Sequence, residues 1–300
     1  TTFTYPQDLS GAQYVAMATA NRTGQVVKTV SRKGGSGGTI MQQQETVFIG
    51  SGGGYVPDKV KYATNGGSLE ERIDYASYDS NGNPLSLIKD GVENIQYLWD
   101  MNKSLPSATI TGAMKTGSST TNPYAYSSFE TTEKGHWTYS GSTSSQSNAP
   151  SGARVYNLNG GAVSRSSLSS SDIYIVGFWA KGTGSVNIAK VLSGSPTNVT
   201  QSITSSWKYY QLEIRNSDTI TLTESAAGNN IDLDEVRIFV KGNQMTTYAY
   251  DGAGRVRTQT GPNGIPIHYE YDLHGRLIRV KDHEHNTLRL MDYKYNKVAY

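Results

Sequence analysis

Short segments in which apolar and polar residues alternate dominate the middle of this chain. These segments are rich in aromatic and β-branched residues, which favour strands. They cover residues 153–158, 174–182, 207–214, 219–223 and 231–239. No helical period runs through this part, so the pattern predicts an antiparallel β-sandwich.

The segment 174–182 is the strongest predicted strand, and both of its faces are apolar. Tyr174, Val176 and Phe178 share one face, and Ile175 and Trp179 share the other. Alternation alone therefore does not decide which face points into the core.

A second pattern, Tyr-x-Tyr-Asp followed by a glycine and an arginine, recurs outside this region. It occupies 248–256 and 269–277, and Tyr250 and Tyr271 are 21 residues apart. A looser copy spans 78–85, and Trp99 follows Tyr78 at the same spacing. So short a period predicts stacked units that do not bury a core alone.

Turn dipeptides divide each of these units into two short strands. Asp90 and Gly91 form such a pair in the first region, and Asn263 and Gly264 form one in the second. Both pairs tolerate positive φ and favour tight hairpins. The region therefore predicts a strip of β-hairpins.

The motif in 269–277 resembles the YD repeat of RHS-repeat proteins, and 248–256 departs from it only at Val256. Residues 97–106 also resemble a stretch common in bacterial RHS surface proteins. The resemblance implies strands that coil into a spiral sheet. We expect an all-β chain: a YD-repeat hairpin strip with an inserted jelly-roll sandwich. The expected domains are repeats in 1–113, a sandwich in 124–241 and repeats in 245–300, with a polar junction at 116–123.

The recurring positions of the motif are interpreted as structural parts of each turn. The aspartate is expected to satisfy backbone donors in its own turn, and the arginine to pair with a neighbouring acid. The residues concerned are Asp79, Asp251, Gly254, Arg255, Asp272, Gly275 and Arg276.

The middle region resembles the jelly-roll carbohydrate-binding modules of bacterial secreted proteins. Phe-Glu at 129–130 precedes a tryptophan, Phe-Trp-Ala-Lys lies at 178–181, and Ile-Asp-x-Asp-Glu-Val closes the region at 231–236. Sugars stack on flat aromatic rings, so Trp179, Tyr209, Tyr210 and Trp137 are candidate ligand-binding residues. The resemblance leaves Trp179 on the outer sheet face and ranks it first, with Tyr209 second. For Trp137, core or edge packing is the preferred interpretation.

A structural calcium is a second candidate, because a metal ties the first strand to the last in the resembled modules. That role falls on Glu130 and Asp234, with Asp232 out of register. Solvated acids at strand ends are the alternative interpretation. No other cofactor is expected.

Composition and motifs exclude several function classes. The net charge of +2, with 17% charged residues, argues against a nucleic-acid partner. The absence of cysteine excludes disulfides and thiol chemistry, and no apolar run approaches the ~18 residues of a membrane span. The Gly-x-Ser-x-Gly match at 34–38 lies in a glycine tract, and His283 and His285 fall where other units place a turn. We therefore expect no enzyme.

Two main functional hypotheses follow, and an accessory region of a glycoside hydrolase is a third alternative. In the first, the chain is a non-enzymatic fragment of a large secreted or cell-surface bacterial protein, and its repeat strip displays a glycan-binding or adhesive sandwich. In the second, the repeats are part of an RHS shell around a toxin or cargo domain. The resemblance also implies a transient outer-membrane export machine as partner, in some such proteins the type 9 secretion system. The glycan and the oligomeric state stay open.

Overall fold

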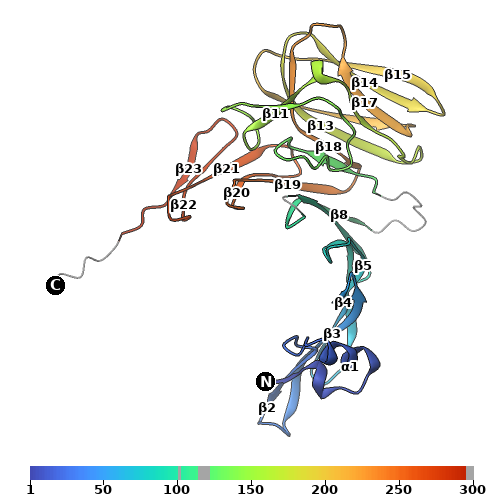
Figure 1. Ribbon diagram of the computed structural model, residues 1–300, viewed down its shortest axis with the longest axis vertical. Coiled ribbons are helices and arrows are strands. Elements are labelled where there is room, and N and C mark those ends of the chain that lie inside the picture. The colour runs from blue at the N-terminus through green and yellow to red at the C-terminus, as the bar shows by residue number, and fades with distance from the viewer. Residues whose placement is uncertain (101–102, 114–121, 295–300) are drawn as a thin grey trace, which may run out of the picture. The chain divides into compact units, whose positions relative to one another are not determined.

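The computed structural model describes residues 1–100, 103–113 and 122–294, and these are almost entirely strands and turns (Figure 1). The prediction of an all-β chain is confirmed. Contacts divide it into two compact units, Thr1–Tyr97 with Thr111–Thr116, and Leu98–Ile110 with Gly117–Tyr300. Most of the predicted junction at 116–123 and the end of the third motif, Tyr295, lie outside the described residues. The three-domain division proposed from the sequence stays a prediction.

The first unit is a succession of antiparallel hairpins. Its strands pair in chain order. They are β1 (Thr2–Thr4), β2 (Lys28–Lys33), β3 (Thr39–Ser51), β4 (Gly54–Thr64), β5 (Glu70–Tyr78), β6 (Pro84–Lys89) and β7 (Glu93–Asp100). Asp90 and Gly91 both adopt positive φ in the tight turn between β6 and β7, as that dipeptide predicts.

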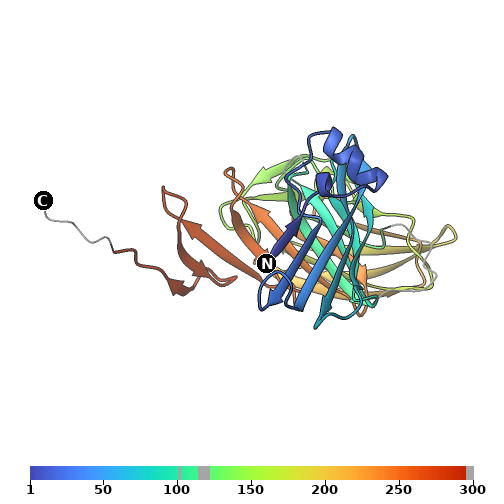
Figure 2. The same cartoon turned by 90° about the horizontal axis from the view of Figure 1, so that it is seen from below.

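Two short helices, which the sequence pattern did not predict, lie in the first unit. They are the 3-10 helix η1 (Pro6–Asp8) and α1 (Ala12–Thr19). Met17 of α1 packs with Val27 and Phe48 in a small apolar cluster beside the N-terminal strands (dark blue in Figure 2). No described helix is long and apolar enough to cross a membrane.

The second unit contains the sandwich, formed by two antiparallel sheets. One sheet orders β10 (Thr143–Ser145), β11 (Arg154–Asn157), β18 (Ile231–Val240), β13 (Ile173–Gly182) and β16 (Lys208–Arg215), with β9 (Ala125–Ser127) also paired to β18. The other orders β12 (Val163–Arg165), β17 (Thr219–Glu224), β14 (Ser185–Leu192) and β15 (Ser195–Ser202). The short helix η2 (Leu158–Gly160) follows β11.

All five strands predicted for the middle region form, with boundaries close to those expected. The β14–β15 hairpin was not predicted. In β14 the alternation of the buried Val186 and Ile188 was missed, whereas β15 is a polar edge strand with almost every residue exposed. Without a buried face, a strand shows no alternation to detect.

Repeat strands continue on both sides of the sandwich in sequence. The order is β8 (Leu105–Ala113), β19 (Gln244–Tyr250), β20 (Val256–Thr260), β21 (Pro266–Tyr271), β22 (Leu277–Lys281) and β23 (Thr287–Leu290). Because β8 and β19 are neighbours in one sheet, the sandwich is inserted between two adjacent repeat strands. Figure 1 shows β13 and β18 lying between β19 on one side and β14 and β17 on the other.

Both faces of β13 are buried, which explains why both are apolar. Tyr174 and Phe178 point into the core between the two sandwich sheets. Ile175 belongs to a second apolar cluster, which contains Ile110 of β8 and Met245 of β19. The sandwich therefore shares a hydrophobic interface with the repeat strands beside it.

Candidate functional site

A bulge in β18 creates the polar part of this interface. Ile231 and Leu233 point into the sandwich core before the bulge, and Val236 and Ile238 do so after it. The alternation of inward and outward side chains along β18 changes phase because Glu235 adopts φ +52° and the pairing with β13 shifts register there. The three-residue spacing from Leu233 to Val236 is the sequence signal that breaks the two-residue period.

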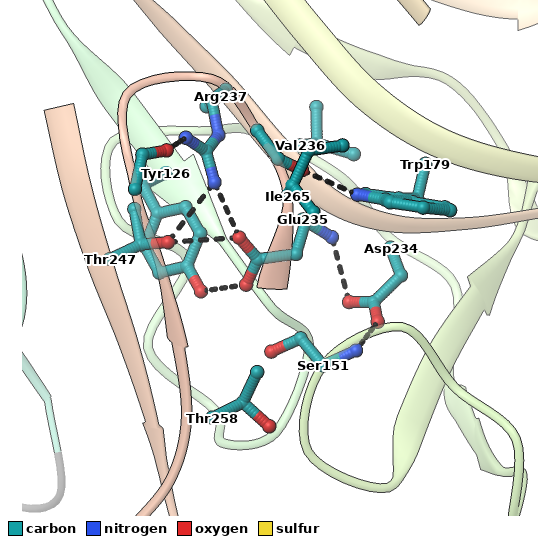
Figure 3. Close-up of polar contacts among 12 residues, drawn as sticks. Tyr126, Ser151, Trp179, Asp234, Glu235, Val236, Arg237, Thr247, Thr258 and Ile265 are labelled. Carbon is teal, nitrogen blue, oxygen red and sulfur yellow. Dashed lines mark hydrogen bonds and ion pairs between the residues drawn. The ribbon is translucent and has the colours of Figure 1, made fainter. Parts of the chain in front are cut away.

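The bulge buries an ion pair against the repeats. Arg237 is fully buried, and its Nη2 lies 2.7 Å from Glu235 Oε2 and 3.1 Å from Thr247 Oγ1. Tyr126 donates its hydroxyl to Glu235 Oε1, and Arg237 Nη1 donates to the Gly261 carbonyl at 3.0 Å. Figure 3 shows these side chains converging from β18, β9 and β19. Sequence reasoning did not single out this network, whose groups are far apart along the chain.

Trp179 lies beside this network and is covered by the repeats. The side chain is 5% exposed, and its Nε1 donates to the Gly264 carbonyl at 2.8 Å. The rings of Tyr209 and His283 flank it, each with its centroid 6.0 Å from the indole. Trp179 therefore lies on the sheet face opposite Tyr174 and Phe178, as expected, but the β20–β21 turn covers that face, so its ring is not an open platform.

The other aromatic candidates differ in exposure. Trp137 and Tyr210 belong to the sandwich core, where the Trp137 indole donates to the Val236 carbonyl at 3.0 Å. The Tyr210 hydroxyl accepts from the Thr204 amide at 3.1 Å. Only Tyr209 among the four candidates keeps a half-buried ring. Glycan binding by these residues stays a prediction.

Glu130 and Asp234, the predicted metal ligands, meet at the loop that precedes β11. Glu130 Oε1 accepts from the Ala153 and Arg154 amides at 2.7 and 2.6 Å. Asp234 Oδ2 accepts from the Ser151 amide at 2.7 Å. Burial raises the pKa of both carboxyls, that of Asp234 well above its ordinary value. The two acids thus fix the loop through its backbone.

The carboxylate oxygens that would bind a metal here already accept hydrogen bonds from amides. Asp234 Oδ1 also accepts from the Glu235 amide at 2.7 Å, and Asp232 accepts from the side chains of Gln146 and Asn157. Within residues 1–100, 103–113 and 122–294, no group of three or more His, Asp or Glu side chains is arranged to hold a metal ion. The calcium stays a prediction.

The fixed loop forms one wall of a cleft of about 310 Å³, and repeat strands form the other. The Gly152 amide donates to Thr258 Oγ1 of β20 at 3.2 Å, which joins the two walls. The cleft is lined by Ser147, Asn148, Ala149, Gly152, Arg257, His268, Tyr269, Glu270, Lys281 and His285.

The charges of this cleft leave a net positive site. Glu270 is neutralised by Lys281, 2.5 Å away, and by Arg279, 3.0 Å away, and these cations lower its pKa. Arg257 is exposed and forms no ion pair or hydrogen bond within the described part of the chain. One guanidinium is therefore available to a ligand.

Two histidines meet at the floor of the cleft. His268 is 8% exposed, and its ring centroid lies 4.5 Å from that of the exposed His285. Burial, followed by the charges of His285, Arg257 and Lys281, lowers the pKa of His268 to about 4. Its Nε2 is buried and has no hydrogen-bond partner among the described residues.

The repeat turns are built by local hydrogen bonds. Asp251 Oδ1 accepts from the Ala253 and Arg255 amides at 2.9 and 3.0 Å, and Oδ2 accepts from Arg255 Nε at 2.7 Å. The same pattern joins Asp272 to Arg276. In both turns the acid that pairs with the arginine is the aspartate of the same turn.

Related turns replace the arginine by asparagine. Asp79 Oδ1 accepts from the Asn81 and Asn83 amides, and Asp282 Oδ1 accepts from the Glu284 and Asn286 amides. Glycine occupies the fourth position with positive φ at Gly82, Gly254 and Gly275. The turn at 282–286 differs, because His285 stands at that position.

Comparisons with solved structures found distant likenesses. The xylan-binding module CBM22-1 of Paenibacillus barcinonensis Xyn10C is 14% identical, with 38% of this chain and 92% of that chain covered and a TM-score of 0.31. A variant of the family 29 carbohydrate-binding module CBM29-2 is 21% identical, with coverages of 40% and 92% and a TM-score of 0.29. An arabinoxylan arabinofuranohydrolase from Bacillus subtilis is 12% identical, with coverages of 72% and 54% and a TM-score of 0.29.

Sequence comparisons identify the repeat part. A search among curated proteins found no match. Residues 250–287, which form the two Asp-x-x-Gly-Arg turns and the strands around them, match the family model described as RHS Repeat.

Proposed function

We propose that this chain is a non-catalytic scaffold in which RHS-type repeats hold a β-sandwich, and that the cleft between the two binds a glycan. The observation that carries the proposal is the cleft of about 310 Å³, which has one wall from each part. Its volume lies at the lower end of the roughly 300–1,000 Å³ range of small-molecule sites. A site of that size accommodates one or two sugar residues.

The lining of the cleft suits a sugar. Tyr269, His268 and His285 supply flat rings for the apolar face of a pyranose, and Ser147 and Asn148 supply polar groups for its hydroxyls. The acids Glu130 and Asp234 hold the Ser147–Asn148 loop through backbone amides. A wall held in this way does not need to be ordered when ligand binds, which favours affinity.

The interface behind the cleft supports a rigid display. The buried Arg237–Glu235 pair and the apolar cluster around Ile175 join sandwich and repeats over an extended area. Rigid attachment suits an extracellular or cell-surface adhesin that carries its ligand under load. We also propose that the protein is extracellular or on the cell surface, with an export machine as a transient partner. The alternative, a wall segment of a cargo shell, rests on the repeat match alone.

A glycan array probed with the whole chain tests the proposal. Asn148→Ala changes an exposed loop residue of the cleft, and Tyr209→Ala removes the half-buried ring of the platform predicted from sequence. We expect Asn148→Ala to weaken array binding and Tyr209→Ala to leave it unchanged, at matched melting temperatures. The reverse result would move the site to the covered sheet face. Release of reducing ends from the bound glycan would contradict a non-catalytic role.

A further inference from the structure

We propose that the ligand of the cleft is an acidic glycan, with a sugar carboxylate bound by Arg257 beside the His268–His285 pair. This inference rests on the proposed function and adds the chemical class of the ligand. It is carried by three independent features of the cleft: an unpaired guanidinium, a histidine at a turn position that favours glycine, and an unpartnered buried nitrogen.

The unpaired guanidinium sets the sign of the ligand charge. The carboxylate of Glu270 is already shared between Lys281 and Arg279, and that of Glu130, on whose pKa Arg257 acts through its charge, is bonded to the Ala153 and Arg154 amides. A guanidinium presents a planar fork of donors that matches a carboxylate with two parallel hydrogen bonds. A neutral sugar offers this guanidinium no opposite charge, whereas a sugar carboxylate does.

The backbone at His285 provides the second feature. His285 has φ +64°, at the position where Gly254 and Gly275 have φ +78°. The left-handed region disfavours residues with a Cβ, although histidine enters it more often than most. The turn itself does not need the ring, because Asp282 accepts the amides of Glu284 and Asn286 as in the other repeats. Strained residues of this kind gather at functional sites.

The third feature is the nitrogen of His268. The low pKa of about 4 keeps this ring neutral at physiological pH, so one nitrogen donates and the other accepts. Nδ1 lies 3.5 Å from Thr258 Oγ1, whereas Nε2 has no partner among the described residues. A buried polar group without a partner is unfavourable, and a sugar hydroxyl or carboxylate would satisfy it.

Isothermal titration of the whole chain with paired oligosaccharides tests the charge. The probes are oligogalacturonate, oligomannuronate and hyaluronan fragments, each beside its carboxyl-reduced, uncharged counterpart. We expect at least one acidic member to bind about tenfold or more tightly than its reduced form, as a charge-assisted pair implies. Equal affinity for both forms would overturn the acidic ligand and leave glycan binding intact. Binding of neither form would overturn the proposed function as well.

Arg257→Gln is the direct variant, and Arg215→Gln is its matched control, an exposed arginine at the end of β16. We expect Arg257→Gln to remove the preference for the acidic form and Arg215→Gln to keep it. Loss of the preference in both variants would assign it to general surface charge and overturn the site. Inorganic phosphate is titrated alone: affinity equal to that of the acidic oligosaccharide would reduce the site to a simple anion site.

His285→Gly separates binding from folding. Because the position favours glycine, we expect the melting temperature of the variant to equal or exceed that of the unchanged chain. The affinity for the acidic oligosaccharide should fall about threefold or more, since the ring that covers His268 is gone. Unchanged affinity would remove the histidine pair from the site.

Discussion

The repeat strip and the sandwich reach stable β structure by different routes. In the strip, each turn is complete within five residues, because Asp251 and Asp272 bond the amides and the guanidinium of their own turn. In the sandwich, stability depends on residues far apart in sequence, such as Arg237 and Tyr126, which meet through Glu235. A turn that is stabilised by its own hydrogen bonds can be repeated along a chain. A fold that is stabilised by contacts between distant residues forms only when those residues are all present.

Contact between repeats follows the same local rule. The Tyr271 hydroxyl donates to the Val256 carbonyl at 2.9 Å, and the Tyr293 hydroxyl donates to Leu277 at 2.8 Å. The guanidinium of Arg255 lies over the Tyr271 ring at 4.9 Å. Each of these tyrosines thus bonds the backbone of the repeat before it, in addition to the pairing between neighbouring strands. The sandwich instead binds the strip through a whole sheet face, which is why one buried substitution there should have the larger effect.

The largest expected effect is at the buried ion pair. Arg237→Met would remove the cationic partner of the buried Glu235, and breaking a buried ion pair in this way typically destabilises by about 3–5 kcal/mol. Urea unfolding measures the loss, with Arg215→Met on the surface as control. Adding Glu235→Leu to the variant should recover part of it. A loss below about 1 kcal/mol would show that the interface does not stabilise the sandwich.

Gly152→Ala tests the wall of the cleft. Gly152 has φ +55°, and a Cβ there would lie 2.2 Å from Glu130 Cδ, so we expect a loss of about 1–3 kcal/mol. Gly252→Ala is the matched control, since its φ is not positive and a Cβ there meets nothing within 4 Å. Equal unfolding free energies for the two variants would contradict the close packing of Glu130 on the loop.

His268 should make stability depend on pH. Its pKa is about 4 in the folded chain and about 6.5 in an unfolded one, so the unfolded state binds more protons between these values. Stability is therefore complete above pH ~6.5 and falls as the pH drops toward 4. The raised pKa values of Glu130 and Asp234 act in the opposite direction, with stability falling as pH rises.

His268→Gln isolates the histidine contribution. The variant should lose part of the acid-side decline in melting temperature between pH 6.5 and 5. It should keep the part that comes from His136, whose pKa burial also lowers, and the opposite slope from the two carboxyls. Identical pH profiles for the variant and the unchanged chain would mean that His268 titrates freely in the fold.

Tyr271→Phe should have a smaller, local effect. Removal of one hydroxyl bond to Val256 is expected to reduce stability by about 0.5–1.5 kcal/mol. Tyr248→Phe is the control, because its hydroxyl forms no hydrogen bond within the described residues. Hydrogen exchange should place the change in β20–β22 and not in the sandwich; protection lost in β13 or β18 would contradict the local rule.

The smallest expected effect is that of EDTA. Amides already occupy the carboxylates of Glu130 and Asp234, so chelation should leave the melting temperature within about 2 °C of its starting value. A clear rise on addition of calcium would establish the metal predicted from sequence and require these amides to turn away.

Much of the architecture could be read from residue patterns. The five strands of the middle region and the Asp-x-x-Gly-Arg turns are fixed by alternation and by bonds between residues two to four positions apart. Such information is contained in any short window of the chain. The turn position of His283 and His285 was predictable for the same reason.

The candidate site was decided by the fold. Trp179 is covered by Gly264, 85 residues away, and the second apolar face of β13 is buried by strands on either side of the insertion. The same packing brings the loop of Ser147 to His268 and His285. Alternation identifies which residues share a face, but long-range packing decides which element covers that face. Here that packing covers the predicted aromatic platform at Trp179 and forms the charged cleft.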